Sequence, residues 1–124
     1  MPGQAIVLDD DEDMRELLAD LLEDSFGFAA LRLSGVASLI ALDGGALGAT
    51  LAILDVNLGP GKPSGLDAYA WLRAQRYAGR VVFMTGHAMN HPLVSRACQL
   101  GDARMLAKPF TLEQLAALIG EGPP

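Results

Sequence analysis

The chain has 124 residues, of which 51% are hydrophobic and 19% charged, a composition typical of one globular domain and not of a disordered segment. It contains no apolar run as long as a membrane span, no signal-peptide pattern and one cysteine, Cys98, so we expect a cytoplasmic protein that binds no membrane. The net charge of −6 is uneven, because residues 1–24 hold nine acids and one base and carry −8, whereas the rest carries +2. An acidic chain also disfavours nucleic-acid binding, which needs clustered lysine and arginine.

Short apolar runs alternate with amphipathic stretches along the whole chain. Runs rich in β-branched residues predict buried strands, and apolar residues at helical spacing predict the helices between them. The expected elements, in order, are a strand over 5–9, a helix over 11–24, a strand over 29–35, a helix over 36–44, a strand over 50–56, a helix over 65–76, a strand over 80–86, a helix over 91–101, a strand over 104–110 and a helix over 111–120.

This alternation predicts an α/β fold with a doubly wound parallel sheet. Continuous apolar strands indicate a sheet covered on both faces, and right-handed crossovers place helices on each side. No repeat, linker or second domain is visible, so residues 1–124 are expected to form one domain. The one Gly/Pro-rich stretch, residues 59–65, is expected to be a surface loop after a strand.

Polar residues follow the apolar strands at the ends where such folds bind ligands. The first strand ends in Asp9 and Asp10, the third in Asp55, the fourth in Thr85 and Gly86, and the fifth in Lys108. If the strands are parallel neighbours, three carboxylates, a hydroxyl and an ammonium converge on one small surface.

Each of these groups has a role in phosphoryl chemistry. Two carboxylates about 4 Å apart repel by roughly 4 kcal/mol at an effective dielectric constant of 20, so a cation should join them. An all-oxygen site suits Mg²⁺ or Mn²⁺. A carboxylate can also attack phosphorus to form an acyl phosphate, while Lys108, framed by "MLA" and Pro109, neutralises the transferred oxygens.

Four segments together resemble the receiver domain of two-component response regulators: "VLDDDEDMR", "AILDVNL", "VVFMTGHA" and "AKPF". The resemblance spans nearly the whole chain and implies a flavodoxin-like (βα)5 fold with strand order 2-1-3-4-5. It implies Mg²⁺-dependent transfer of a phosphoryl group from a histidine kinase or histidine phosphotransfer protein, which switches protein contacts. Such a domain is a signalling phosphoacceptor and not an enzyme acting on a separate substrate.

The resemblance also assigns the acidic site. Asp55 would accept the phosphoryl group. Asp10 and Asp55 would bind Mg²⁺ directly, Asp9 through water, and Asn57 through its backbone carbonyl. The acids of residues 11–13 are instead expected in the first turn of the helix, where carboxylates interact favourably with its dipole.

The remaining assignments concern the fourth and fifth strands. Thr85 would turn its hydroxyl toward the phosphoryl group, Lys108 would pair with a phosphoryl oxygen, and Pro109 would follow a cis peptide bond. His87 lies where a side chain could reach attacking water and tune dephosphorylation, although an ordinary loop histidine is the alternative.

Two features depart from the family pattern. The loop after Asp55 is about two residues longer than usual, which bears on how partners reach the site. Met105 stands where receivers commonly have an aromatic residue that swings inward on activation. A flexible thioether fills space differently from a ring, so we expect a weaker or differently shaped activation signal.

Other readings fit the residues less well. Acids alternate from Asp9 as in a calcium loop, but Met14 and Asp20 stand where that loop needs glycine and glutamate. Pro63 follows the lysine where a P-loop needs serine or threonine. A haloacid-dehalogenase-type phosphatase would have threonine or valine at Asp13 and usually more chain. A degenerate, constitutive protein-binding module remains an alternative because of Met105.

The resemblance also suggests the partner surfaces. The helix over 11–24 and the loops around the site would face the kinase. The helix over 91–101, the strand segment 104–107 and the helix over 111–120 would form an output or homodimer face. The sequence does not name the kinase or the target, and it fits both a stand-alone regulator and a receiver from a longer protein.

Overall fold

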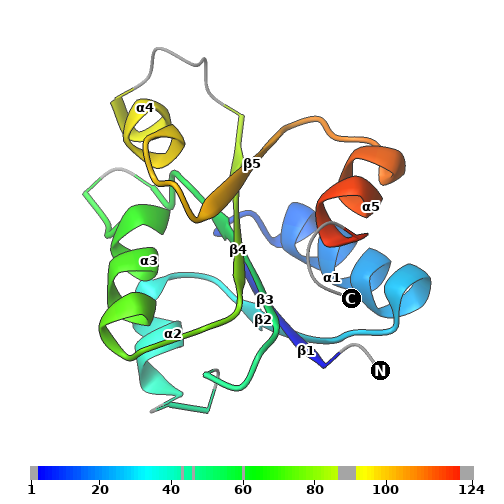
Figure 1. The fold of residues 1–124 in the computed structure, drawn as a ribbon, viewed down its shortest axis with the longest axis horizontal. Coiled ribbons are helices and arrows are strands. Elements are labelled where there is room, and N and C mark those ends of the chain that lie inside the picture. Colours follow the sequence, from blue (N-terminus) through cyan, green and yellow to red (C-terminus); the bar gives the residue numbers. More distant parts are fainter. Residues whose placement is uncertain (1–2, 43, 46, 60, 87–91, 121–124) are drawn as a thin grey trace.

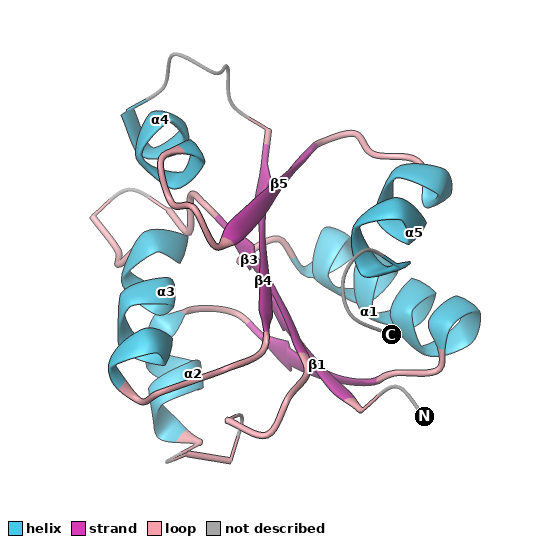
Figure 2. Cartoon of the chain, in the orientation of Figure 1, coloured by secondary structure: helices cyan, strands magenta, loops and turns pink. Residues whose placement is uncertain are grey.

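A parallel sheet in the order β2-β1-β3-β4-β5 forms the centre of the computed structural model, and helices cover both faces (Figures 1 and 2). The structure describes residues 3–42, 44–45, 47–59, 61–86 and 92–120. Within these ranges the elements are β1 (Gln4–Leu8), α1 (Glu12–Phe26), β2 (Ala29–Leu33), α2 (Val36–Ala41), β3 (Leu51–Asp55), α3 (Gly65–Ala74), β4 (Arg80–Thr85), α4 (Pro92–Cys98), β5 (Ala103–Ala107) and α5 (Leu112–Gly120). The predicted fold class and strand order are confirmed.

Each face of the sheet has its own apolar core, because neighbouring residues of a strand point to opposite faces. Helices α1 and α5 lie on one side of the sheet and α2, α3 and α4 on the other (Figure 1). In β1, for example, Ile6 packs on the α2–α4 side and Val7 on the α1–α5 side, both fully buried. The acidic edge described below therefore rests on a sheet that is buried on both faces.

The predicted element boundaries differ from the structure by one to three residues at the carboxyl ends of most strands and helices, and by at most one residue at their starts. The first strand ends at Leu8, so Asp9 lies just beyond it. The fifth strand was predicted over 104–110, but it ends at Ala107. Pro109 has no N–H to donate, which is why this part of the chain does not continue the ladder. The predicted helix over 91–101 corresponds to Pro92–Cys98, with residue 91 outside the described ranges.

Side-chain caps begin the helices that lead away from this edge. The Asp11 carboxylate accepts a hydrogen bond from the backbone N–H of Asp13 and caps α1, so residues 11–13 belong to the helix start as predicted. Thr111 caps α5. Its hydroxyl accepts from the Gln114 N–H while the Gln114 side chain accepts from the Thr111 N–H, which is a capping box.

Candidate functional site

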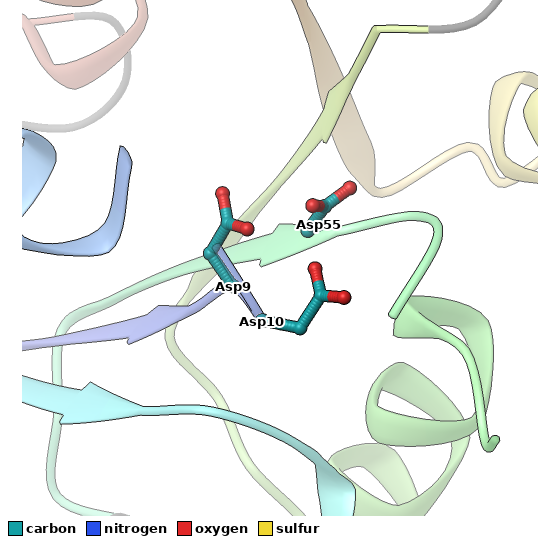
Figure 3. A group of neighbouring side chains, drawn as sticks. All are labelled: Asp9, Asp10 and Asp55. Atoms are coloured by element: carbon teal, nitrogen blue, oxygen red, sulfur yellow. The ribbon is translucent and has the colours of Figure 1, made fainter. Parts of the chain in front are cut away.

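Three carboxylates meet at the carboxyl ends of β1 and β3. Asp9 and Asp10 directly follow β1, and Asp55 is the last residue of the neighbouring strand β3. One oxygen from each carboxylate lies within 4.8 Å of the others (Figure 3). Asp9 is fully buried and Asp55 nearly so, whereas Asp10 is exposed to solvent. The predicted acidic cluster is therefore present, with one open side at Asp10.

Lys108 joins two of these carboxylates. Its ammonium donates to Asp9 Oδ2 and Asp55 Oδ2, each at 3.1 Å. The Lys108 backbone N–H donates to the carbonyl of Thr85 at 2.7 Å, and Thr85 is itself buried at the end of β4. The Lys108–Pro109 peptide bond is cis, as predicted. The fourth and fifth strands thus bring their polar residues to the acidic edge.

Burial and neighbouring charges shift the pKa values of Asp55 and Lys108. Burial raises the pKa of Asp55 to about 7, and the neighbouring Asp9 charge adds to the effect, while Lys108 opposes it. Burial disfavours the charged form of Lys108, but Asp55 and Asp9 outweigh it and raise the pKa of that ammonium. One ammonium therefore does not fully compensate the charge of the buried carboxylates, and additional positive charge would stabilise the cluster.

Asp9 is held by contacts that the sequence did not reveal. Its Oδ1 accepts from the backbone N–H of Asp11 at 2.9 Å, and its backbone carbonyl accepts from Arg15 Nη1 at 3.0 Å. Residues 1–24 contain nine acids and a single base, Arg15. This lone positive charge was the feature of the sequence that could have pointed to a structural role for Arg15. Arg15 ties the first turn of α1 to the end of β1.

Backbone groups hold Asp55 from the other side. The N–H of Asn57 donates to Asp55 Oδ1 at 3.2 Å, and the Asn57 side-chain oxygen accepts from the N–H of Gly59 at 3.0 Å. A Cβ on Gly65 would lie 2.2 Å from the Asp55 carbonyl oxygen, a distance at which the atoms overlap. Gly65 therefore lets α3 start directly against the end of β3, which sequence reasoning did not foresee.

The donor set fits a hard divalent cation. All three side chains offer carboxylate oxygens, the ligands that Mg²⁺ and Ca²⁺ prefer. Both oxygens of Asp9 already accept hydrogen bonds, from Asp11 and Lys108. The Asp10 carboxylate accepts none from the part of the chain that the structure describes, so it is the more available ligand.

Two further predicted positions have different outcomes. Met105 lies in β5 opposite Phe83 of β4 and packs, partly buried, against the core on the α2–α4 side. Its proposed effect on activation stays a prediction. His87 lies outside the described residues.

Among the described helices none combines the length and apolar character needed to cross a membrane.

The fold and the site together define a class of signalling domain. A five-stranded parallel sheet whose edge carries paired acids after β1, a buried aspartate ending β3 and a lysine after β5 is the arrangement of a receiver. A model of the response regulator receiver domain family matches residues 5–120. The chain belongs to this family and is a receiver domain of two-component signalling, and membership does not favour the phosphatase alternative.

Three individual similar proteins agree with this family assignment. The chain is 36% identical over 118 residues to the transcriptional regulatory protein FixJ of Bradyrhizobium diazoefficiens, covering 94% of this chain but only 55% of that protein. The receiver domain of NtrX from Brucella abortus is 25% identical, with a TM-score of 0.80, over 94% of this chain and 95% of that one. A response regulator from Burkholderia pseudomallei, solved with a phosphorylated aspartic acid, a calcium ion and citrate, is 29% identical, with a TM-score of 0.76, over 95% of this chain and 66% of that one.

Proposed function

We propose that this receiver accepts a phosphoryl group on Asp55 from a phosphohistidine donor. The observation that carries the proposal is the placement of Asp55 in an acidic cluster that is open to solvent at Asp10, with the Asp55 Oδ2 3.1 Å from the Lys108 ammonium. The phosphorylated aspartic acid of the Burkholderia pseudomallei relative supports it. A carboxylate oxygen is a competent nucleophile toward phosphorus when nearby positive charge offsets the charge of the transferred group.

In this reaction an Asp55 oxygen forms a bond to phosphorus while the bond between phosphorus and the donor imidazole nitrogen breaks. The bonding pair leaves with the imidazole nitrogen. Lys108, already paired with Asp55, would pair with a phosphoryl oxygen in the product. Thr85, at the end of the strand beside β3, accepts the Lys108 N–H with its carbonyl and would donate its hydroxyl to another phosphoryl oxygen. The result is one phosphoryl group per chain and not catalytic turnover, so the protein is not an enzyme acting on a separate substrate.

The residues that would hold Mg²⁺, or Mn²⁺, are Asp10 and Asp55 through their carboxylates and Asn57 through its backbone carbonyl. Asp9, with both oxygens engaged, would act through water. When bound, the metal ion supplies positive charge that offsets the charge of the transferred oxygens. The calcium ion in the Burkholderia pseudomallei relative supports a divalent cation here.

We further infer the kind of partner. A histidine kinase or a histidine phosphotransfer protein would supply the phosphoryl group, in the cytoplasm where such donors act. The face formed by α4, β5 and α5 would carry the output contact or a homodimer. The relative FixJ is a transcriptional regulatory protein, and the match covers 55% of its length.

The test is intact-protein mass spectrometry after incubation with Mg²⁺ and a small phosphodonor such as acetyl phosphate. We expect one added phosphoryl group on the wild-type chain and none on Asp55→Asn or in the presence of EDTA. Asp24→Asn, which makes the same change at an exposed acid of α1, should be phosphorylated like the wild type. If the small donor fails, the same comparison with a phosphohistidine protein decides, and no addition from either donor would favour a constitutive binding module.

A further inference from the structure

The long loop after β3 places a second lysine beside the acidic site. Lys62 is one of only two lysines in the chain, and it lies in the stretch 59–65, which the sequence predicts to be a surface loop. A Cβ built on Gly59 would lie 3.5 Å from Lys62 Cδ and 3.7 Å from Asp10 Oδ2. The lysine stem and the Asp10 carboxylate therefore approach the same point above the Gly59 backbone.

The local backbone keeps Lys62 in this position. Gly59 has a φ of 116°, a conformation that residues with a side chain rarely adopt, so the space between the two side chains stays open. The Lys62 N–H donates to the Gly59 carbonyl at 3.2 Å, which turns the loop back on itself. The Gly59 N–H in turn donates to the Asn57 side chain, so the turn is anchored directly after Asp55.

Asp10 and Lys62 are complementary in charge. Lys108 pairs with Asp9 and Asp55 but not with Asp10. Neither the Asp10 carboxylate nor the Lys62 ammonium makes an ion pair or hydrogen bond with the described residues. The ammonium is two bonds beyond Cδ, and both groups are exposed, so the lysine side chain is free to turn toward the carboxylate. Figure 3 shows the Asp10 carboxylate on the side of Asp55 from which the chain continues toward α3.

We propose that Lys62 is a counter-ion of Asp10 that competes with the divalent cation and so sets the metal affinity of the receiver. This role rests on the proposed function, because it assumes that Asp10 binds the metal. With the metal absent, Lys62 offsets the charge of the Asp10 carboxylate. When the metal binds, two cations face the same carboxylate and Lys62 must withdraw into solvent. Lys62 thereby weakens metal binding.

The test is the Mg²⁺ dissociation constant of the full chain, measured by isothermal titration calorimetry at low ionic strength. Lys62→Gln should tighten binding by a factor of about 3 to 10, because an exposed charge near a ligand acts weakly through solvent. Lys62→Arg keeps the charge and should bind like the wild type. In about 0.5 M NaCl the effect of Lys62→Gln should shrink, because the Debye length falls below 10 Å.

Arg76→Gln is the matched control. Arg76 is also exposed, and it lies beyond the far end of α3, a ten-residue helix about 15 Å long that starts beside Asp55. Arg76→Gln removes one positive charge far from Asp10 and should leave the Mg²⁺ dissociation constant nearly unchanged. Equal constants for the wild type, Lys62→Gln and Arg76→Gln would overturn the role of Lys62 and leave the proposed function standing. No Mg²⁺ binding by the wild-type chain would contradict both.

Discussion

The described residues include two clusters in which one basic side chain faces several carboxylates, and these clusters differ in burial. The surface cluster lies between β2 and α1, where Arg32 is within 2.8–3.1 Å of three acids of α1: Glu16, Asp20 and Glu23. These side chains are between 30% and 62% exposed. The pKa of Glu23 is lowered, first by a backbone hydrogen bond from Ala30 and then by Arg32. The surroundings of Glu23 therefore favour its ionised form.

The site cluster of Lys108, Asp9 and Asp55 has similar ion-pair distances, but its surroundings shift the pKa of a carboxylate in the opposite direction. Its carboxylate side chains are at most 7% exposed, and the pKa of Asp55 is raised, not lowered. Water cannot solvate these charges, so the single ammonium leaves a surplus of negative charge in a poorly polarisable place. The ion pairs of the surface cluster therefore link β2 to α1. The buried carboxylates of the site cluster, in contrast, are incompletely neutralised, so binding of a cation or transfer of a phosphoryl group to Asp55 would relieve their repulsion.

The largest expected effect comes from removing the buried cation. Lys108→Met leaves two buried carboxylates without an ammonium, which should lower the free energy of unfolding by about 3 kcal/mol at pH 8 in EDTA. Urea unfolding followed by circular dichroism measures this. Lys62→Met, which removes the exposed lysine, should change stability little. A loss from Lys108→Met no larger than that of Lys62→Met would break the contrast between the two clusters.

Removing the buried carboxylate should have the opposite sign. Asp55 has a raised pKa when folded, so between its unfolded pKa near 4 and about 7 the folded state binds more protons, and stability falls as the pH rises. Asp55→Asn abolishes this loss and should raise the free energy of unfolding at pH 8 by up to about 4 kcal/mol in EDTA.

At pH 5 the gain from Asp55→Asn should fall by more than half, to roughly 1.5 kcal/mol, because only the part of the titration window between about pH 4 and pH 5 then contributes. Urea unfolding at both pH values provides the measurement, with Asp24→Asn as an exposed control. A gain that is the same at pH 5 and pH 8 would show that the charge of Asp55 is not what destabilises the site.

The smallest effect is expected at the surface cluster. Arg32→Met should destabilise the protein less than Lys108→Met, because solvent takes over the solvation of all three acids. The remaining loss should vanish in about 0.5 M NaCl, where exposed charges are screened. Thermal unfolding at low and high salt tests this. A loss that persists at high salt would mean that Arg32 contributes through packing of its stem and not through its charge.

Much of the fold and the site could be predicted because the relevant signals are local. Alternating apolar and amphipathic stretches predicted the element order, and polar residues at strand ends predicted that Asp9, Asp10, Asp55, Thr85 and Lys108 meet. The boundaries were less accurate where the ladder stops, as at residues 108–110, because hydrogen-bond pairing with a neighbouring strand decides the end of a strand.

What the sequence by itself determined is the set of groups at the edge of the sheet, since residue type and strand order settle which side chains arrive there. The tertiary structure alone decided which charges pair. Lys108 joins Asp9 and Asp55 but leaves Asp10 open, Arg15 holds the Asp9 carbonyl, and the turn at Gly59 brings Lys62 beside Asp10. The physical reason is that burial and distance set the strength of each charge interaction, and both depend on elements far apart in the chain.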